Sequence, residues 1–313
     1  MLSYLLKRLL ATLPVLALVG LFVFGLLFIA PGDPAAIVAG DQASPADIAR
    51  IRASMGLDRP FLVQLGTWFW QILHGNLGKS IFNGLPVSQL IGDRVGPTLS
   101  LMAVTLVIAI VVAVPSGVLA AARAGTWVDR GIMALAVLGF STPVFVLGYV
   151  LSFWLALKLQ WLPVQGYTPL DQGVWPWLRN LLMPAAALGF IYIALIARVT
   201  RATMLDVLQQ DYIRTARAKG LGHAAVLYVH ALKNASVPIA TAIGIGIALL
   251  IGGAVVTESV FAIPGLGRLT VDAILQRDYP VIQGVVLVSS VAYVLVNLLV
   301  DVLYSVLDPR IRY

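Results

Sequence analysis

The sequence predicts an all-α integral membrane protein with six membrane-spanning helices. Of its 313 residues, 60% are hydrophobic and only 11% are charged, and the mean hydropathy is +0.94. A soluble chain of this length would need a polar surface that so few charged residues cannot supply. The apolar residues are also gathered into six long segments, which is the pattern of a chain that crosses a bilayer several times.

Each apolar segment meets or approaches the length of a membrane span. A bilayer core of about 30 Å needs about 20 helical residues. The segments are Leu9–Ala30, Leu99–Ala122, Gly131–Leu157, Asn180–Ala197, Val237–Val256 and Val281–Val300. Lys7 and Arg8 precede the first, as in a secretory signal, but its apolar run exceeds the roughly 7–15 residues of a signal core. We therefore expect a retained first span.

The distribution of charge predicts the orientation. Six spans place both ends on one side, and that side (residues 1–8, 123–130, 198–236 and 301–313) holds twelve Lys/Arg against five acids. The other side holds nine of each, and five of its nine basic residues lie in one long loop, which the positive-inside rule discounts. We expect both termini in the cytosol. The net charge of +7 is thus a topology signal.

The long loop predicts a small extracytoplasmic insertion after the first helix. Ser44 followed by Pro45 and Asp47 is typical of a helix start, and Gly56 of its end. A second amphipathic helix is expected from the spacing of Phe61, Leu65, Trp68, Phe69 and Ile72. The predicted organisation is residues 1–30 (cytosolic end and first helix), 31–97 (extracytoplasmic region), 98–306 (helices two to six) and 307–313 (cytosolic tail).

The residue types that carry most catalytic and metal chemistry are sparse. There is no cysteine, which excludes disulfides, thiolate metal sites and cysteine nucleophiles. The histidines, His74, His223 and His230, all lie between the predicted spans. Neither a zinc-helix motif nor a nucleophile elbow occurs, so we predict no catalytic, metal-binding or cofactor-binding residue. A membrane-embedded hydrolase using Ser141 would find no base at that depth.

The segment 205–236 is the most informative part of the chain. Apolar side chains at Leu205, Leu208, Tyr212 and Ala216 predict an amphipathic helix from Leu205 to Lys219, which Gly220 ends. A turn at Leu221 and Gly222 leads to a second short helix, Ala224–Ala235. The product is a helix–turn–helix elbow with an apolar tip, suited to a protein groove. A basic helix that binds membrane lipid is the alternative. Nucleic acid is not expected as a partner, because the stretch has few interleaved aromatics.

This elbow resembles the coupling loop of ABC importer permeases, in particular the peptide/nickel branch. The resemblance covers Arg214-Thr215-Ala216-Arg217-Ala218-Lys219-Gly220 and His230-Ala231-Leu232-Lys233-Asn234-Ala235. The general form of that loop is Glu-Ala-Ala-x3-Gly-x9-Ile-x-Leu-Pro. With its glycine on Gly220, Ala216 and Leu232 match, whereas Arg214, Thr215, His230 and Lys233 depart from it. The expected ATPase-coupling residues are Arg214, Thr215, Ala216, Arg217, Ala218, Lys219, Gly220, Leu221 and Gly222.

Further motifs extend the resemblance over nearly the whole chain. They are Pro31-Gly32-Asp33-Pro34, Gly56-Leu57-Asp58-Arg59-Pro60, Phe261 with Pro264-Gly265-Leu266-Gly267-Arg268, Arg277–Gln283 and Leu307–Arg312. The resemblance implies a type I ABC importer permease fold in a bacterial cytoplasmic membrane. It also implies a second homologous permease subunit, two cytosolic ATPase subunits that bind ATP and Mg, and an extracytoplasmic solute-binding protein. No cofactor is expected on this chain itself.

The spans give a weaker signal for the pathway. No ionisable residue lies in the central part of any span, which disfavours an ion-coupled secondary transporter, although sodium sites made of backbone remain open. Pro115, Pro143 and Pro184 predict kinks. Ser141, Thr142 and Pro143 are candidate pathway residues, and Glu258 is a candidate gating residue. The resemblance favours di- or oligopeptides or glutathione as substrate, with a nickel chelate as the alternative.

Overall fold

The computed structural model describes residues 2–29, 32–40 and 42–307. Within these residues the chain is helical, and its only β pairing is an isolated bridge between Lys79 and Pro86. The predicted all-α class is confirmed. Pro31 and the terminal motif from Asp308 onward lie outside the described residues.

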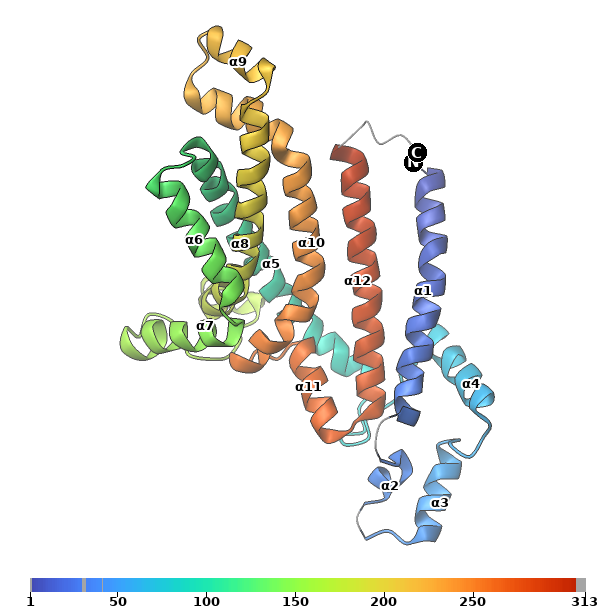
Figure 1. Ribbon diagram of the computed structural model, residues 1–313. Coiled ribbons are helices and arrows are strands. Elements are labelled where there is room, and N and C mark those ends of the chain that lie inside the picture. Colours follow the sequence, from blue (N-terminus) through green and yellow to red (C-terminus); the bar gives the residue numbers. More distant parts are fainter. Residues whose placement is uncertain (1, 30–31, 41, 308–313) are drawn as a thin grey trace. The chain divides into compact units, whose positions relative to one another are not determined.

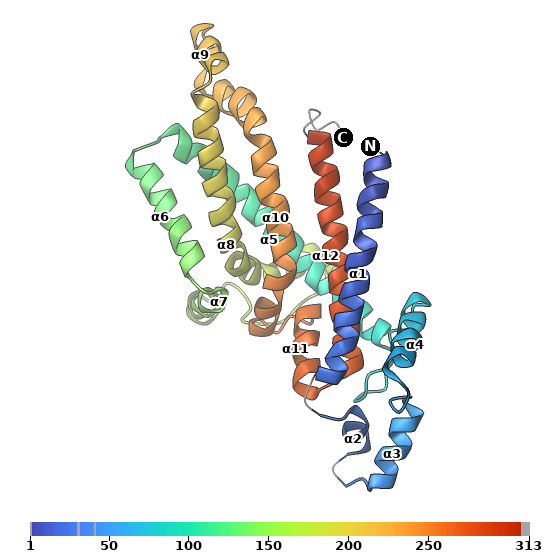
Figure 2. The same cartoon turned by 45° about the vertical axis from the view of Figure 1, so that its right-hand side comes forward.

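The chain divides into two compact units (Figures 1 and 2). The first comprises residues 1–96 and 268–295. It contains α1 (Leu2–Ile29), α2 (Pro34–Ala39), α3 (Pro45–Ser54), α4 (Phe61–Leu73), the start of α5 (Val87–Ala122), most of α11 (Leu266–Gln276) and most of α12 (Tyr279–Leu307).

The second unit comprises residues 97–267 and 296–313. After the remainder of α5 it contains α6 (Trp127–Ser141), α7 (Val144–Leu151), the π-helical η1 (Ser152–Lys158), the 3-10 turn η2 (Leu170–Gln172), α8 (Val174–Leu208), α9 (Asp211–Ala218), the π-helical η3 (Ala225–Ala231) and α10 (Leu232–Val260).

Five helices of the described residues are long and apolar enough to cross a membrane. They are Leu10–Ile29, Val87–Ala122, Val174–Leu208, Ala225–Val260 and Tyr279–Val300. They confirm the first, second, fourth, fifth and sixth predicted spans. A sixth crossing exists if α6 and α7–η1 are counted together.

The third predicted span is wrong as a single helix. Between α6 and the helix that starts at Val144 the axis bends by 108°. Pro143 has no N–H to continue the backbone hydrogen bonds of α6. It also keeps Thr142 in an extended conformation (φ −94°, ψ 119°). The α5 and α8 helices continue through Pro115 and Pro184. Pro143 therefore breaks its helix, whereas Pro115 and Pro184 are accommodated within theirs.

In the first unit, the two helices predicted between the first and second spans are present. Ser44 caps α3 in a reciprocal capping box with Asp47, and Pro45 occupies the first turn. The Ser80 hydroxyl donates to the buried carboxylate of Asp278 at 2.5 Å, which ties the loop before α5 to the start of α12. α4 packs along α1 through aromatic side chains.

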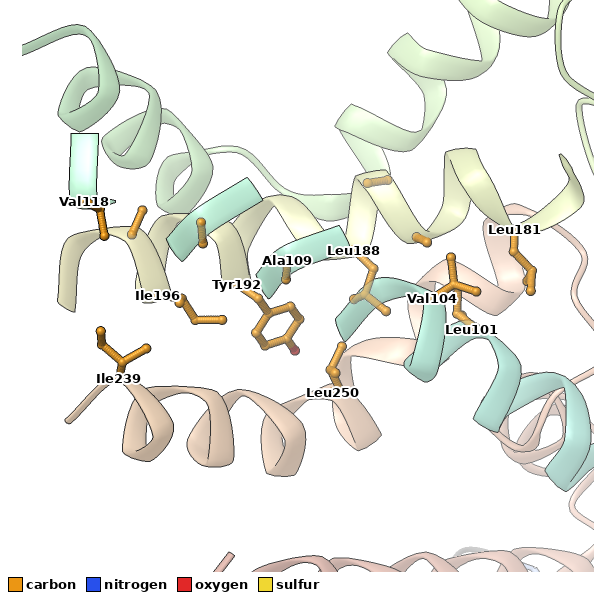
Figure 3. Close-up of a cluster of buried hydrophobic side chains, with 14 of the residues drawn as sticks. Leu101, Val104, Ala109, Val118, Leu181, Leu188, Tyr192, Ile196, Ile239 and Leu250 are labelled. Carbon is orange, nitrogen blue, oxygen red and sulfur yellow. The ribbon is translucent and has the colours of Figure 1, made fainter. Parts of the chain in front are cut away.

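The core of the second unit is built around α8. Apolar side chains from α5 (Leu101, Val104, Ala109), α8 (Leu181, Leu188, Tyr192, Ile196) and α10 (Ile239, Leu250) meet there (Figure 3). α8 has α10, α6 and α7 as its main neighbours. It is the helix on which the others of this unit are assembled.

Glycines let the neighbouring helices approach α8 closely. A Cβ added at Gly117 of α5 would lie 2.6 Å from Thr200 Cβ and 2.7 Å from the Ala197 carbonyl oxygen. One added at Gly139 of α6 would lie 2.9 Å from Ala194 Cβ. Small residues at such contacts are the usual means of helix association in lipid, because burial of apolar side chains gives little driving force there.

Candidate functional site: an exposed elbow and a buried outer turn

The elbow begins where α8 ends. Gln210 is extended (φ −71°, ψ 150°) and starts a new helix, α9, whose first-turn acid is Asp211. α9 packs against η3, with Ile213 and Ala216 buried. η3 contributes the buried Val226, Leu227 and Ala231 and continues without a break into α10. The elbow is therefore attached to both α8 and α10.

Two details of the predicted elbow are wrong. Leu205 and Leu208 belong to α8, because the extended Gln210 divides the expected helix in two. The buried face of α9 also differs by one residue: Ile213 is fully buried, whereas Tyr212 is 42% exposed. Tyr212 instead hydrogen-bonds the side chain of Asn234, and partial burial raises its pKa.

The predicted tip is present and accessible. Gly220 ends α9 with φ +79°, a conformation that favours glycine. Leu221 is 41% exposed, and of the nine predicted coupling residues only Ala216 is buried. Arg214 forms an exposed ion pair with Asp211 at 3.3 Å, and no salt bridge is recorded in the described residues for Arg217 or Lys219. The elbow thus presents two exposed cationic side chains, Arg217 and Lys219, and the apolar tip residue Leu221. It is anchored by the buried contact between α9 and η3.

Glu258 lies at the other end of α10, where the chain leaves the span. Its carboxylate is fully buried and accepts a hydrogen bond from the Thr98 hydroxyl of α5 at 2.6 Å. The same Thr98 oxygen accepts the Leu266 N–H at 2.8 Å. Gly265 and Gly267 leave no room for a Cβ against the Glu258 carboxylate. The only glutamate in the chain therefore holds α5, α10 and the turn before α11 together.

The loop after η1 is fastened to the same place. Phe261, buried at the end of α10, lies 3.2 Å from the Cβ position of Gly148 in α7. Its carbonyl accepts the Gly166 N–H at 2.9 Å, and the Gln165 side chain donates to the Val260 carbonyl at 3.0 Å. We call residues 258–267 the outer turn, after the orientation that the charge distribution predicts.

The other candidate pathway residues lie at the bend between α6 and α7. The exposed Ser141 hydroxyl donates to the Val137 carbonyl of its own helix at 3.0 Å, and the exposed Pro143 starts α7. Thr142 is half-buried between them. Within the described residues these three form no recorded hydrogen bond to Glu258.

A buried ion pair near the elbow was missed by sequence reasoning. Asp129, in the first turn of α6, is 3% exposed. Its Oδ1 accepts from Arg201 Nε at 2.5 Å, and its Oδ2 accepts from Arg201 Nη2 at 2.7 Å and from the Gly125 N–H at 2.9 Å. The pair joins the start of α6 to α8, seven residues before α8 ends. In the sequence, Asp129 and Arg201 look like ordinary charged residues next to spans, so only the fold reveals that they pair.

The described residues contain no cluster of three His, Asp or Glu side chains that could hold a metal ion. The described site residues instead form two polar contacts, Thr98–Glu258 near the end of α10 and Asp129–Arg201 near the end of α8, with the exposed elbow beyond the second. Figure 1 shows α9 of the elbow at the far end of α8.

Comparison with known proteins identifies the family. Residues 113–313 match the model of the binding-protein-dependent transport system inner membrane component, and residues 1–102 match its N-terminal model. The chain belongs to this family. It is an ABC importer permease subunit, an inner-membrane component of a transport system that depends on a binding protein, as the elbow predicted.

Curated relatives cover the whole permease. A probable peptide ABC transporter permease of Sinorhizobium fredii is 53% identical over 99% of both chains. The glutathione transport permease GsiC of Salmonella choleraesuis is 42% identical, and the dipeptide transport permease DppB of Alkalihalophilus pseudofirmus is 39% identical, each over the full length of both chains. The inward-facing MetNI methionine ABC transporter matches with a TM-score of 0.59 at 19% identity, over 70% of this permease and 97% of that chain. It supports the type I fold.

We predict that the Asp129–Arg201 pair responds non-additively to substitution. Asp129→Asn leaves the Arg201 side chain, which is 28% exposed, without its counter-charge, and the loss of one partner of such a bond costs about 1–3 kcal/mol. Adding Arg201→Gln removes the orphaned charge, so the double variant should be more stable than Asp129→Asn alone. Thermal unfolding of the four proteins in detergent measures this; a double variant whose loss equals the sum of the single losses contradicts it.

Proposed function

We propose that this permease carries di- or oligopeptides, or a small peptide such as glutathione, inward across the cytoplasmic membrane by alternating access. The names of the relatives above support the peptide class over a nickel chelate. In this proposal a solute-binding protein delivers the peptide outside the cell, a second homologous permease completes the pathway, and two ATPase subunits bind ATP and Mg in the cytosol. Both termini and the elbow are cytosolic.

The exposed elbow is the observation that carries the coupling proposal. A helix that only bound lipid would present one flat apolar or charged face, whereas here the apolar tip Leu221 follows two exposed cations, Arg217 and Lys219. An acidic or amide-lined groove on an ATPase subunit would fit this combination. We assign residues 214–222 as the contact with that subunit.

The base of the elbow transmits the displacement. Ile213 and Ala216 bury α9 against η3, and η3 is continuous with α10. α8 in turn is tied to α6 by Asp129 and Arg201. A push on the tip therefore reaches α6, α8 and α10 together, which supports rocking of this bundle as the motion that opens and closes the pathway.

Gly220→Val should reduce ATP-driven uptake strongly while the protein still inserts and folds. Nothing lies within 4 Å of the added Cβ, so the effect comes from the backbone: at φ +79° a β-branched residue costs about 1–3 kcal/mol and would reshape the tip. Uptake of a labelled dipeptide into vesicles containing the complete transporter measures the loss.

Gly40→Val is the matched control, because Gly40 has φ +81° and is equally uncrowded but lies far from the elbow in the sequence. It should retain uptake. Equal uptake by Gly220→Val and the unsubstituted transporter, at equal amounts in the membrane, would remove residues 214–222 from the coupling proposal.

We assign the outer turn as the outer closure of the pathway. Glu258 fixes the turn to α5 through Thr98, and the buried Phe261 fixes it to α7 and the following loop. The outer turn thus holds α5, α7 and α10 together, and these helices can separate only if its contacts break. We propose that the pathway is lined by Ser141, Thr142 and Pro143. Opening the pathway does not require any bond of these residues to break.

Glu258→Ala should therefore loosen the closed outer end. It removes the acceptor of the buried Thr98 hydroxyl. It also removes the carboxylate that packs against Gly265 and Gly267. ATP hydrolysis by the assembled transporter should become less dependent on the binding protein, with the basal rate raised several-fold. Ser141→Ala, whose hydroxyl bonds only within α6, should leave that dependence intact. An unchanged basal rate in assembled Glu258→Ala would contradict the closure role.

A further inference from the structure

α4 contains no charged residue, and it is too short to span a bilayer. It has 13 residues, Phe61–Leu73. Its neighbour α3 carries Asp47, Arg50 and Arg52. The two helices belong to the same predicted extracytoplasmic insertion, yet only α3 has the composition of a helix in water.

Aromatic contacts place α4 beside the outer half of α1. Phe61 lies 5.2 Å from Phe28 between ring centroids, and Trp68 lies 5.5 Å from Phe24. Further along, a Cβ at Gly20 would lie 2.9 Å from the ring of Phe69. α4 thus runs antiparallel to α1, from its end near Phe28 back toward its middle, as Figures 1 and 2 both show.

The depth of this contact follows from helix geometry. The apolar span of α1 is Leu10–Ile29, and Gly20 is near its midpoint. Nine residues separate Gly20 from Ile29, a rise of about 14 Å at 1.5 Å per residue, or nearly half of a bilayer core of about 30 Å. The Phe69 end of α4 therefore lies well below the outer boundary of the span against which it packs.

The three sides of α4 differ in composition. One side contacts α1. A second side, with Gln64, Thr67 and Gln71, lines a cavity of about 370 Å³ that the start of α12 also borders. The third side is apolar and uncovered: Leu62, Val63, Trp70 and Leu73 are 76%, 47%, 65% and 78% exposed. These four residues recur at helical spacing and form the outward face of α4.

Three of the last four carbonyls of α4 have hydrogen-bond partners just beyond the helix. The Trp70 carbonyl accepts from the His74 N–H and lies 2.8 Å from His74 Nδ1. The Gln71 and Ile72 carbonyls accept from the Asn76 and Gly75 N–H groups, both at 2.9 Å. Helix ends in hydrocarbon require such internal partners, because lipid tails offer none. The three partnered carbonyls at this end are compatible with a helix that stops inside a bilayer.

We propose that α4 is a re-entrant membrane helix whose outward face, Leu62, Val63, Trp70 and Leu73, contacts the acyl chains of the outer leaflet. The depth of its contact with α1, the absence of charge and the capped inner end argue for lipid as the occupant. α1 also exposes apolar side chains, and its Leu18 and Phe22 are 66% and 62% exposed. The side with Gln64, Thr67 and Gln71 faces the cavity and stays polar.

The absence of cysteine allows a direct test in the assembled transporter. Spin labels are placed singly at Leu62→Cys, Trp70→Cys and Leu73→Cys, with the complex in nanodiscs of phosphatidylethanolamine and phosphatidylglycerol. Two controls are matched: Gln71→Cys lies on the cavity side of the same helix, and Arg50→Cys lies on the exposed surface of α3. Accessibility to dissolved oxygen is compared with accessibility to a water-soluble nickel chelate.

The labels at Leu62, Trp70 and Leu73 should favour oxygen over the chelate several-fold more than the labels at Gln71 and Arg50. Equal chelate access at Leu73 and Arg50 would place α4 in water and overturn the proposal. Protection of the three positions from both reagents would also overturn it, because a protein partner rather than lipid would then cover the face.

Discussion

Helices in a bilayer gain little from burying apolar side chains against one another, so what holds them together is close backbone approach and the polar bonds that lipid cannot replace. In this permease both kinds of contact converge on α8. Gly117 and Gly139 bring α5 and α6 against it, and Arg201 binds the buried Asp129 at the end that leads to the elbow. In the proposed coupling, these contacts prevent a displacement of α9 from being absorbed by sliding of the helices before it reaches the pathway.

The second tie, at the outer turn, has a different character. Glu258 accepts a hydrogen bond from the Thr98 hydroxyl of α5 and is enclosed by Gly265 and Gly267. It therefore joins α5 to α10 and the following turn, whereas the Asp129–Arg201 pair joins α6 to α8.

Much of this arrangement could be predicted from the sequence, because span length and turn residues are local properties. Ser44 with Pro45 fixed the start of α3, and Gly220 fixed the end of the elbow helix. Periodicity was less reliable where a short helix packs on one side only: the pattern favoured Tyr212 as buried, but the contact with η3 uses Ile213. The partner of Asp129 depends on a contact between distant segments, which one sequence does not reveal. Pro143 did predict a kink in the third span, but not its size of 108°.

The central claim is that α9 moves as one body with α6 and α8. It can be tested by pulsed EPR distances between labels at Arg217→Cys in α9 and Trp127→Cys at the start of α6, both exposed positions, in the assembled transporter with and without ATP. We expect the same distance distribution in both states. A shift or broadening on addition of ATP would mean that α9 pivots at Gln210, and the account of force transmission through α8 would be wrong.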